Sequence, residues 1–130
     1  MSGRYGRRGR AKPASGGWEV ALWYLMRITG LGLFVLVLSH YLILHVLYSP
    51  ADQHSGWIAE IRWSSTFWRT LDWLMLMLVL FHGFMGMRTV VSDYTNGGTR
   101  VAVTTGLYVL AVLLLVMGTV VVMTLPNVIP

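Results

Sequence analysis

Three long stretches without charged residues constrain the fold of this chain more than any other feature. Val101–Leu125 runs for 25 residues without a charge or a proline, and Ile28–Tyr48 runs for 21 residues without a charge. About 20 consecutive apolar residues let an α-helix cross a bilayer, so both stretches predict spanning helices. Hydrophobic residues make up 55% of the chain and charged residues only 12%, about half the charge of a soluble domain. The sequence therefore predicts a membrane protein.

A shorter uncharged stretch predicts a further spanning helix between these two. Trp73–Met87 has only 15 uncharged residues, roughly 22 Å of helix against a hydrocarbon core of about 30 Å. To span, this helix must include neighbours on both sides, which places Asp72 and Arg88 near the membrane interfaces or against other protein. We expect an all-α membrane protein with three transmembrane helices, at about 18–48, 66–93 and 101–125, in a three-helix unit over 18–130.

Basic residues predict the orientation of these helices. Five of them lie in the first 17 residues, and Arg88 and Arg100 lie on either side of the connection between the second and third helices. The positive-inside rule places both regions in the cytoplasm. The connection over about 49–66 balances its charges and is expected on the outer side, with the C-terminus. We expect residues 1–17 to be a disordered basic tail, because they have almost nothing apolar to bury. Contact with anionic lipid explains this tail better than nucleic-acid binding does.

Histidine is the residue type that any metal centre here must use, because the sequence contains no cysteine. This excludes an iron–sulfur cluster ligated by cysteines of this chain. Three of the four histidines lie in predicted membrane helices: His40, His45 and His82. Such a histidine either bridges to a neighbouring helix or binds haem iron axially. Gly83 and Gly86 lie beside His82 and suit both a flat macrocycle and close helix packing.

An acid and a phenol end the second predicted helix. Asp93 follows His82 by eleven residues, about three turns and about 16 Å along the axis, so the two share one helix face. Arg27, near the cytoplasmic end of the first helix, is expected at a depth similar to that of Asp93 and Tyr94. A cation, a carboxylate and a phenol at one membrane surface suit a quinone, whose reduction needs hydrogen-bond donors and protons. The alternatives are an arginine that extends to the headgroups and an interfacial aromatic residue.

Three segments of this sequence resemble a known family. They are Trp23–Gly30 (WYLMRITG), Phe67–Asp72 (FWRTLD) and His82–Tyr94 (HGFMGMRTVVSDY). They are similar to the hydrophobic membrane-anchor subunit of succinate dehydrogenase, in the bacterial form with two anchor chains. The resemblance extends from Trp18 to Leu125, and the spacing from histidine to the Asp-Tyr pair is its more specific element.

The resemblance implies a role for each candidate residue. His82 would be an axial ligand of haem b, with the other ligand from a second anchor subunit, the cytochrome b subunit. Tyr94, Asp93 and Arg27 would line the site of a quinone, ubiquinone or menaquinone. Arg27 and Arg88 would contact the haem propionates. A helix-one histidine, His40 or His45, would serve a second haem if there is one; we expect one haem.

The family also implies partners and a place in the cell. This chain would pack with the second anchor into a haem-containing bundle in the bacterial inner membrane and dock an iron–sulfur subunit and a flavoprotein. It would pass electrons from succinate to quinone without itself oxidising succinate. The alternatives are a haem-binding anchor of another quinone-linked dehydrogenase and a non-catalytic three-helix membrane protein whose histidines only bridge helices.

Overall fold

Three long helices form the body of the computed structural model, which describes residues 17–128. They are α1 (Gly17–Leu42), α3 (Thr66–Tyr94) and α4 (Gly97–Val128). Each is long and apolar enough to cross a membrane. The prediction of an all-helical membrane protein with three spanning helices is confirmed, and residues 17–128 contain no strand. The predicted tail at 1–17 falls almost wholly outside the described residues.

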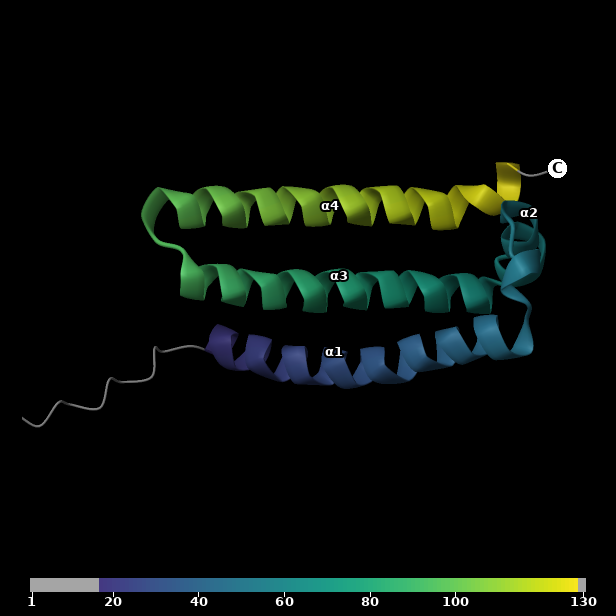
Figure 1. Ribbon diagram of the computed structural model, residues 1–130, viewed down its shortest axis with the longest axis horizontal. Helices are drawn as coiled ribbons and strands as arrows, with labels where there is room; N and C mark the ends of the chain where they lie inside the picture. Colours follow the sequence, from purple (N-terminus) through teal and green to yellow (C-terminus); the bar gives the residue numbers. More distant parts are fainter. Residues whose placement is uncertain (1–16, 129–130) are drawn as a thin grey trace, which may run out of the picture.

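The middle helix of the structure is α3, which packs against α1 on one side and α4 on the other (Figure 1). The helices run antiparallel to their neighbours. The start of α1 and the α3–α4 connection lie at one end, which we call the tail end. The α1–α3 connection and the end of α4 lie at the other, which we call the loop end. Three crossings in alternating directions agree with the predicted topology.

The contact between α3 and α4 is close at the loop-end half of the two helices. A Cβ on Gly118 would lie 2.5 Å from Leu76 Cδ2, so the absence of a side chain lets α3 approach α4. One residue further on, Thr119 Oγ1 accepts a hydrogen bond from Trp73 Nε1 at 3.0 Å. Small residues and interhelical hydrogen bonds hold helices together where surrounding lipid is as apolar as the side chains.

A short connection joins α3 to α4. The sequence predicted the third helix from about residue 101, but α4 begins at Gly97. Gly97 has φ +56°, a left-handed conformation that costs glycine little, and it reverses the chain between the two helices. Arg100 Nε donates to Thr95 O at 2.9 Å, and the Arg100 guanidinium also donates to Ser92 O. Arg100 therefore binds the carbonyl groups at the end of α3 that have no helical partner.

The loop-end connection consists largely of short helical turns. The first helix continues as a π-helical turn, η1 (Ile43–Leu47). Three short turns follow: η2 (Pro50–Asp52), α2 (Ser55–Trp57) and η3 (Ile58–Arg62). Together they cover the loop end of the bundle (Figure 1).

Four side chains, which we call the loop-end polar cluster, attach this connection to the helices: His40, Arg62, Trp63 and Asp72. Arg62 donates to both oxygens of Asp72, at 2.9 Å from Nε and 2.7 Å from Nη2. Trp63 Nε1 donates to Asp72 at 2.9 Å, and His40 Nδ1 lies 3.3 Å from its Oδ1. Arg62 is only 5% exposed and pairs with Asp72, a contact for which the sequence analysis made no prediction.

The described part of the chain has almost no apolar core. Its buried apolar residues are only Ala59 and Val122, while large side chains on all three long helices are exposed. A nearly flat row of three helices cannot enclose a core, because most of each helix faces outward. The apolar faces must therefore be covered by lipid or by another protein.

Candidate functional site

His82 lies on α3 and contacts α1. Its Nδ1 is 3.1 Å from Thr29 Oγ1, and Thr29 is 7% exposed. A Cβ on Gly30 would lie only 3.1 Å from His82 Cε1, so the glycine makes room for the imidazole ring. Among the described residues, no hydrogen bond reaches Nε2 of this ring. The α1–α3 contact therefore positions one ring nitrogen and leaves the other available.

A cationic cavity of about 250 Å³ lies on the same α1–α3 contact, toward the tail end. It is lined by Glu19, Leu22, Trp23, Met26, Arg27, Met85, Arg88 and Thr89. The Arg27 guanidinium carbon lies 3.3 Å from the centroid of the Trp23 ring, a cation–π contact that orients the side chain. Two arginines outnumber the single glutamate, so the cavity suits an anion such as a carboxylate.

The cavity and the imidazole lie close together along α3. Six residues separate His82 from Arg88, or about 9 Å of helix. Gly86 lies between them on α3 and has no side chain. A Cβ at Gly86 would lie 4.0 Å from Met26 Cε on α1, which is an ordinary van der Waals distance. The structure thus places Arg27 and Arg88, the two predicted propionate contacts, in one cavity at the α1–α3 contact, and His82, the predicted haem ligand, at the same contact.

Asp93 and Tyr94 lie apart from this cavity, at the last residues of α3. Neither residue lines it, and Tyr94 is 84% exposed. Arg27 lines the cavity together with Arg88, which lies about 7.5 Å along α3 from Asp93. Arg27 is therefore not beside the Asp-Tyr pair. In the part of the chain that the structure describes, the two side chains face outward and are accessible to another protein or a ligand.

The remaining histidines have local partners. His40 belongs to the loop-end polar cluster. His45 stacks on Tyr41 with ring centroids 4.5 Å apart, and its Nδ1 lies 3.2 Å from Tyr41 O. His54 is exposed and accepts a hydrogen bond from Trp57 N at 3.3 Å, so it caps α2.

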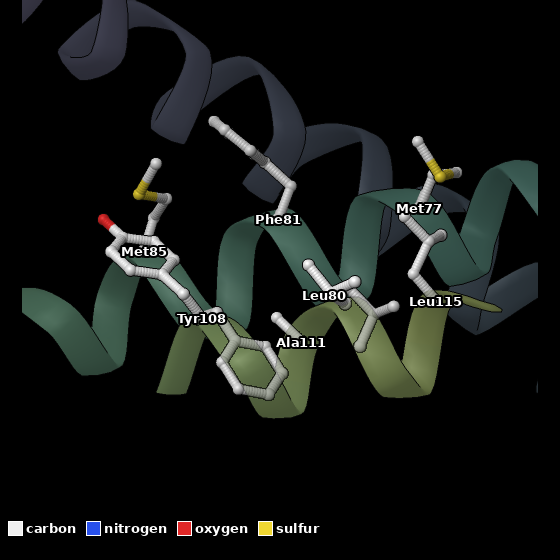
Figure 2. A pocket seen from close by; sticks show the side chains of 9 residues that line it. Met77, Leu80, Phe81, Met85, Tyr108, Ala111 and Leu115 are labelled. Carbon is white, nitrogen blue, oxygen red and sulfur yellow. The ribbon is translucent and has the colours of Figure 1, made fainter. Parts of the chain in front are cut away.

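A second cavity, between α3 and α4, has a different character (Figure 2). Its volume is about 260 Å³, and its lining is apolar: Met77, Leu80, Phe81, Phe84, Met85, Tyr108, Ala111, Val112 and Leu115. Apart from the Tyr108 hydroxyl, no side chain there offers a hydrogen-bond donor to a polar ligand. We therefore place no quinone head group in it.

The residues fit haem better than they fit a bare metal ion. Residues 17–128 hold no group of three or more His, Asp or Glu side chains that could bind an ion. Haem iron needs only one protein ligand on each face, which a single histidine supplies. His82 provides an available nitrogen, glycines provide space, and the two arginines provide counter-charges for propionates.

Sequence reasoning missed two parts of this arrangement. Thr29 was noted only as part of the Trp23–Gly30 segment, although a hydroxyl in an apolar helix is a signal for a polar partner across the contact. The pairing of Arg62 with Asp72 was missed because Asp72 was considered only as a charge near a membrane interface or against other protein. Asp72 stands between the apolar residues Leu71 and Trp73, and an acid in that setting is a signal for a buried partner.

Fold and site together define a class: a multi-pass membrane subunit with a histidine placed between helices and apolar faces left for other chains. Comparison with known proteins agrees. The sequence profile of the succinate dehydrogenase/fumarate reductase transmembrane subunit family matches residues 8–124. The chain is also 30% identical over 82 residues to the succinate dehydrogenase hydrophobic membrane anchor subunit of Archaeoglobus fulgidus, covering 63% of this chain and 68% of that protein.

This chain belongs to the succinate dehydrogenase/fumarate reductase transmembrane subunit family. The resemblance drawn from the sequence is confirmed. The protein is a multi-pass membrane anchor whose role lies within that enzyme complex, together with the other subunits.

Proposed function

We propose that this anchor would hold one haem b through His82, together with a second anchor subunit that would supply the other ligand. The observation that carries the proposal is the position of His82. Its ring is fixed at the α1–α3 contact through Nδ1, its Nε2 makes no hydrogen bond within the described residues, and the lining of the cationic cavity begins at Met85, three residues further along α3. Arg27 and Arg88 bind the propionates in this arrangement.

The haem supplies a one-electron carrier within the membrane, and this chain holds it. His82 would supply one ligand to the iron, and the row of three helices leaves large apolar side chains exposed. A second anchor must therefore close the haem site, because a half-exposed macrocycle and unpartnered arginines are costly in lipid. We assign His40 to the loop-end polar cluster, where Asp72 and Arg62 already contact its Nδ1, and we propose a single haem.

The quinone site that we propose lies at the tail end, around Asp93 and Tyr94. Electrons come from succinate through a flavoprotein and an iron–sulfur subunit docked on this surface. The quinone takes two electrons and two protons and leaves as quinol. The Tyr94 hydroxyl donates to a quinone carbonyl, and Asp93 passes protons from the cytoplasm. Arg27 would take part in quinone binding only by leaving its position over Trp23. The exposure of Asp93 and Tyr94 supports this role, since a bound partner and a quinone need access to them.

The orientation proposed for the chain follows from these roles. The tail end, with the basic residues 1–17, faces the cytoplasm, and the loop end faces outward. The membrane that we propose is the bacterial inner membrane.

The first test is a dithionite-reduced minus oxidised spectrum of membranes that contain the co-expressed complex. We expect a b-type signal in the native complex, loss of that signal in His82→Ala, and an unchanged signal in His40→Ala. Partial loss in each variant would point to two haems. Absence of a haem band from the native complex would contradict the proposal and leave a haem-free anchor.

A further inference from the structure

Thr29 is one of two polar or charged residues that are buried within residues 17–125; Arg62 is the other. Thr29 lies in an apolar spanning helix, two residues after Arg27, and its hydroxyl contacts α3. The only group of α3 within hydrogen-bond distance of this hydroxyl is His82 Nδ1, at 3.1 Å. Each of the two residues is thus the polar partner of the other across the helix contact.

The direction of the hydrogen bond follows from the other contacts of Thr29. A threonine hydroxyl carries one hydrogen. Thr29 Oγ1 lies 2.7 Å from Leu25 O and 3.3 Å from Met26 O, and a carbonyl oxygen can only accept. The hydroxyl hydrogen is therefore directed to the backbone of α1, and the oxygen accepts from His82. It follows that His82 carries its proton on Nδ1.

We infer that Thr29 is a positioning residue for the haem ligand: it holds His82 as the Nδ1–H tautomer and presents the Nε2 lone pair to iron. The inference rests on the proposed haem site. A neutral imidazole has one protonated nitrogen and one lone pair, and the hydrogen bond of the first decides which nitrogen can bind a metal. Gly30 allows the ring to come close enough for this bond, since a Cβ would lie 3.1 Å from its Cε1.

The test uses Thr29→Val, which keeps the branched shape but removes the hydroxyl, and Thr29→Ser, which keeps the hydroxyl. Both are made in the co-expressed complex, and haem content and the haem midpoint potential are measured. A hydrogen bond accepted from Nδ1–H makes the imidazole more electron-rich and stabilises ferric iron. We expect Thr29→Val to raise the potential and to weaken haem retention by about 10-fold. We expect Thr29→Ser to restore both.

The matched control is Thr124→Val. Thr124 makes the same hydrogen bond to its own helix, Oγ1 to Val120 O at 2.7 Å, but it is exposed, and its hydroxyl makes no contact with a histidine. It should leave both readouts unchanged. Native potential and haem content in Thr29→Val would overturn the inference, as would equal changes in the valine and serine variants. A native complex without haem would overturn the proposed function itself, so the two failures are distinguishable.

Discussion

At the scale of single residues, the polar side chains of the spanning helices are found in two different environments. His82 and Thr29 satisfy each other inside the helix contact. Asp93 and Tyr94 make no such arrangement within the described residues and stay exposed at the end of α3. The atoms that form a buried hydrogen bond already have their partner. An exposed acid and an exposed phenol at a membrane surface are accessible to a ligand.

The proposed role of Asp93 predicts a selective defect. Asp93→Asn keeps the shape of the side chain but removes its ability to carry a proton. We expect quinone reduction by the co-expressed complex to fall by about 100-fold, in the range of lost acid–base catalysis. Succinate oxidation with a soluble dye acceptor should be unchanged, since the dye takes electrons before they reach this chain. Equal losses in the two assays would show that the substitution disturbs assembly instead.

At the scale of helices, the loop-end polar cluster decides how the connection between α1 and α3 folds. Arg62, at the end of η3, reaches the first turns of α3 and binds Asp72 through two hydrogen bonds. Arg62 also lies over the Trp68 ring, with its guanidinium carbon 4.5 Å from the centroid. One additional hydrogen bond, from Trp63 to Asp72, helps to offset the cost of removing these charges from water.

This cluster predicts a large stability effect. Asp72→Asn leaves the buried Arg62 charge without its counter-charge, which costs about 3 kcal/mol. We expect a lower Tm of the detergent-solubilised complex. The control is Asp52→Asn, an exposed acid in the same connection, which should leave Tm unchanged.

The double variant Arg62→Leu, Asp72→Leu separates the charge effect from a packing effect. Removing both charges should recover much of the lost stability, because no unpaired charge then remains. A double variant as unstable as Asp72→Asn would mean that the hydrogen-bonded geometry, not charge pairing, holds the connection.

At the scale of the whole molecule, the row of three helices is an incomplete structure. With two buried apolar residues in its described part, the chain gains little stability from its own core. The exposed faces and the one-sided haem site both require other chains.

We expect the chain to be unstable when it is expressed without its partner subunits. In detergent it should aggregate or be degraded, whereas co-expression with the second anchor should give one species by size-exclusion chromatography with a b-type spectrum. A stable monomer that carries haem and reduces quinone alone would contradict the proposed hetero-oligomer.

The orientation can be tested cleanly because the chain has no cysteine. Ser55→Cys, in the loop-end connection, should react in intact cells with a maleimide that does not cross membranes. Asn96→Cys, between α3 and α4, should react only after the membrane is opened. The reverse pattern would show that the tail end faces outward.

The protein class, the three spanning helices and the family could all be predicted from the amino-acid sequence. Length, apolar runs and the spacing between His82 and Asp93 are local properties of the chain, and each helix satisfies its own backbone within lipid whatever its neighbours. The candidate residues His82, Arg27 and Arg88 also came from the sequence, though their grouping on one surface did not.

The contacts between side chains of different helices could not be predicted in this way. The hydrogen bond between Thr29 and His82, the pair of Arg62 with Asp72, and the position of α3 between α1 and α4 depend on how each helix is rotated and which helices are neighbours. Periodicity fixes the faces of a helix but not the partner of each face. In this protein the partner is chosen by close approach at Gly30 and Gly118 and by the few polar groups that must find one another in an apolar surrounding.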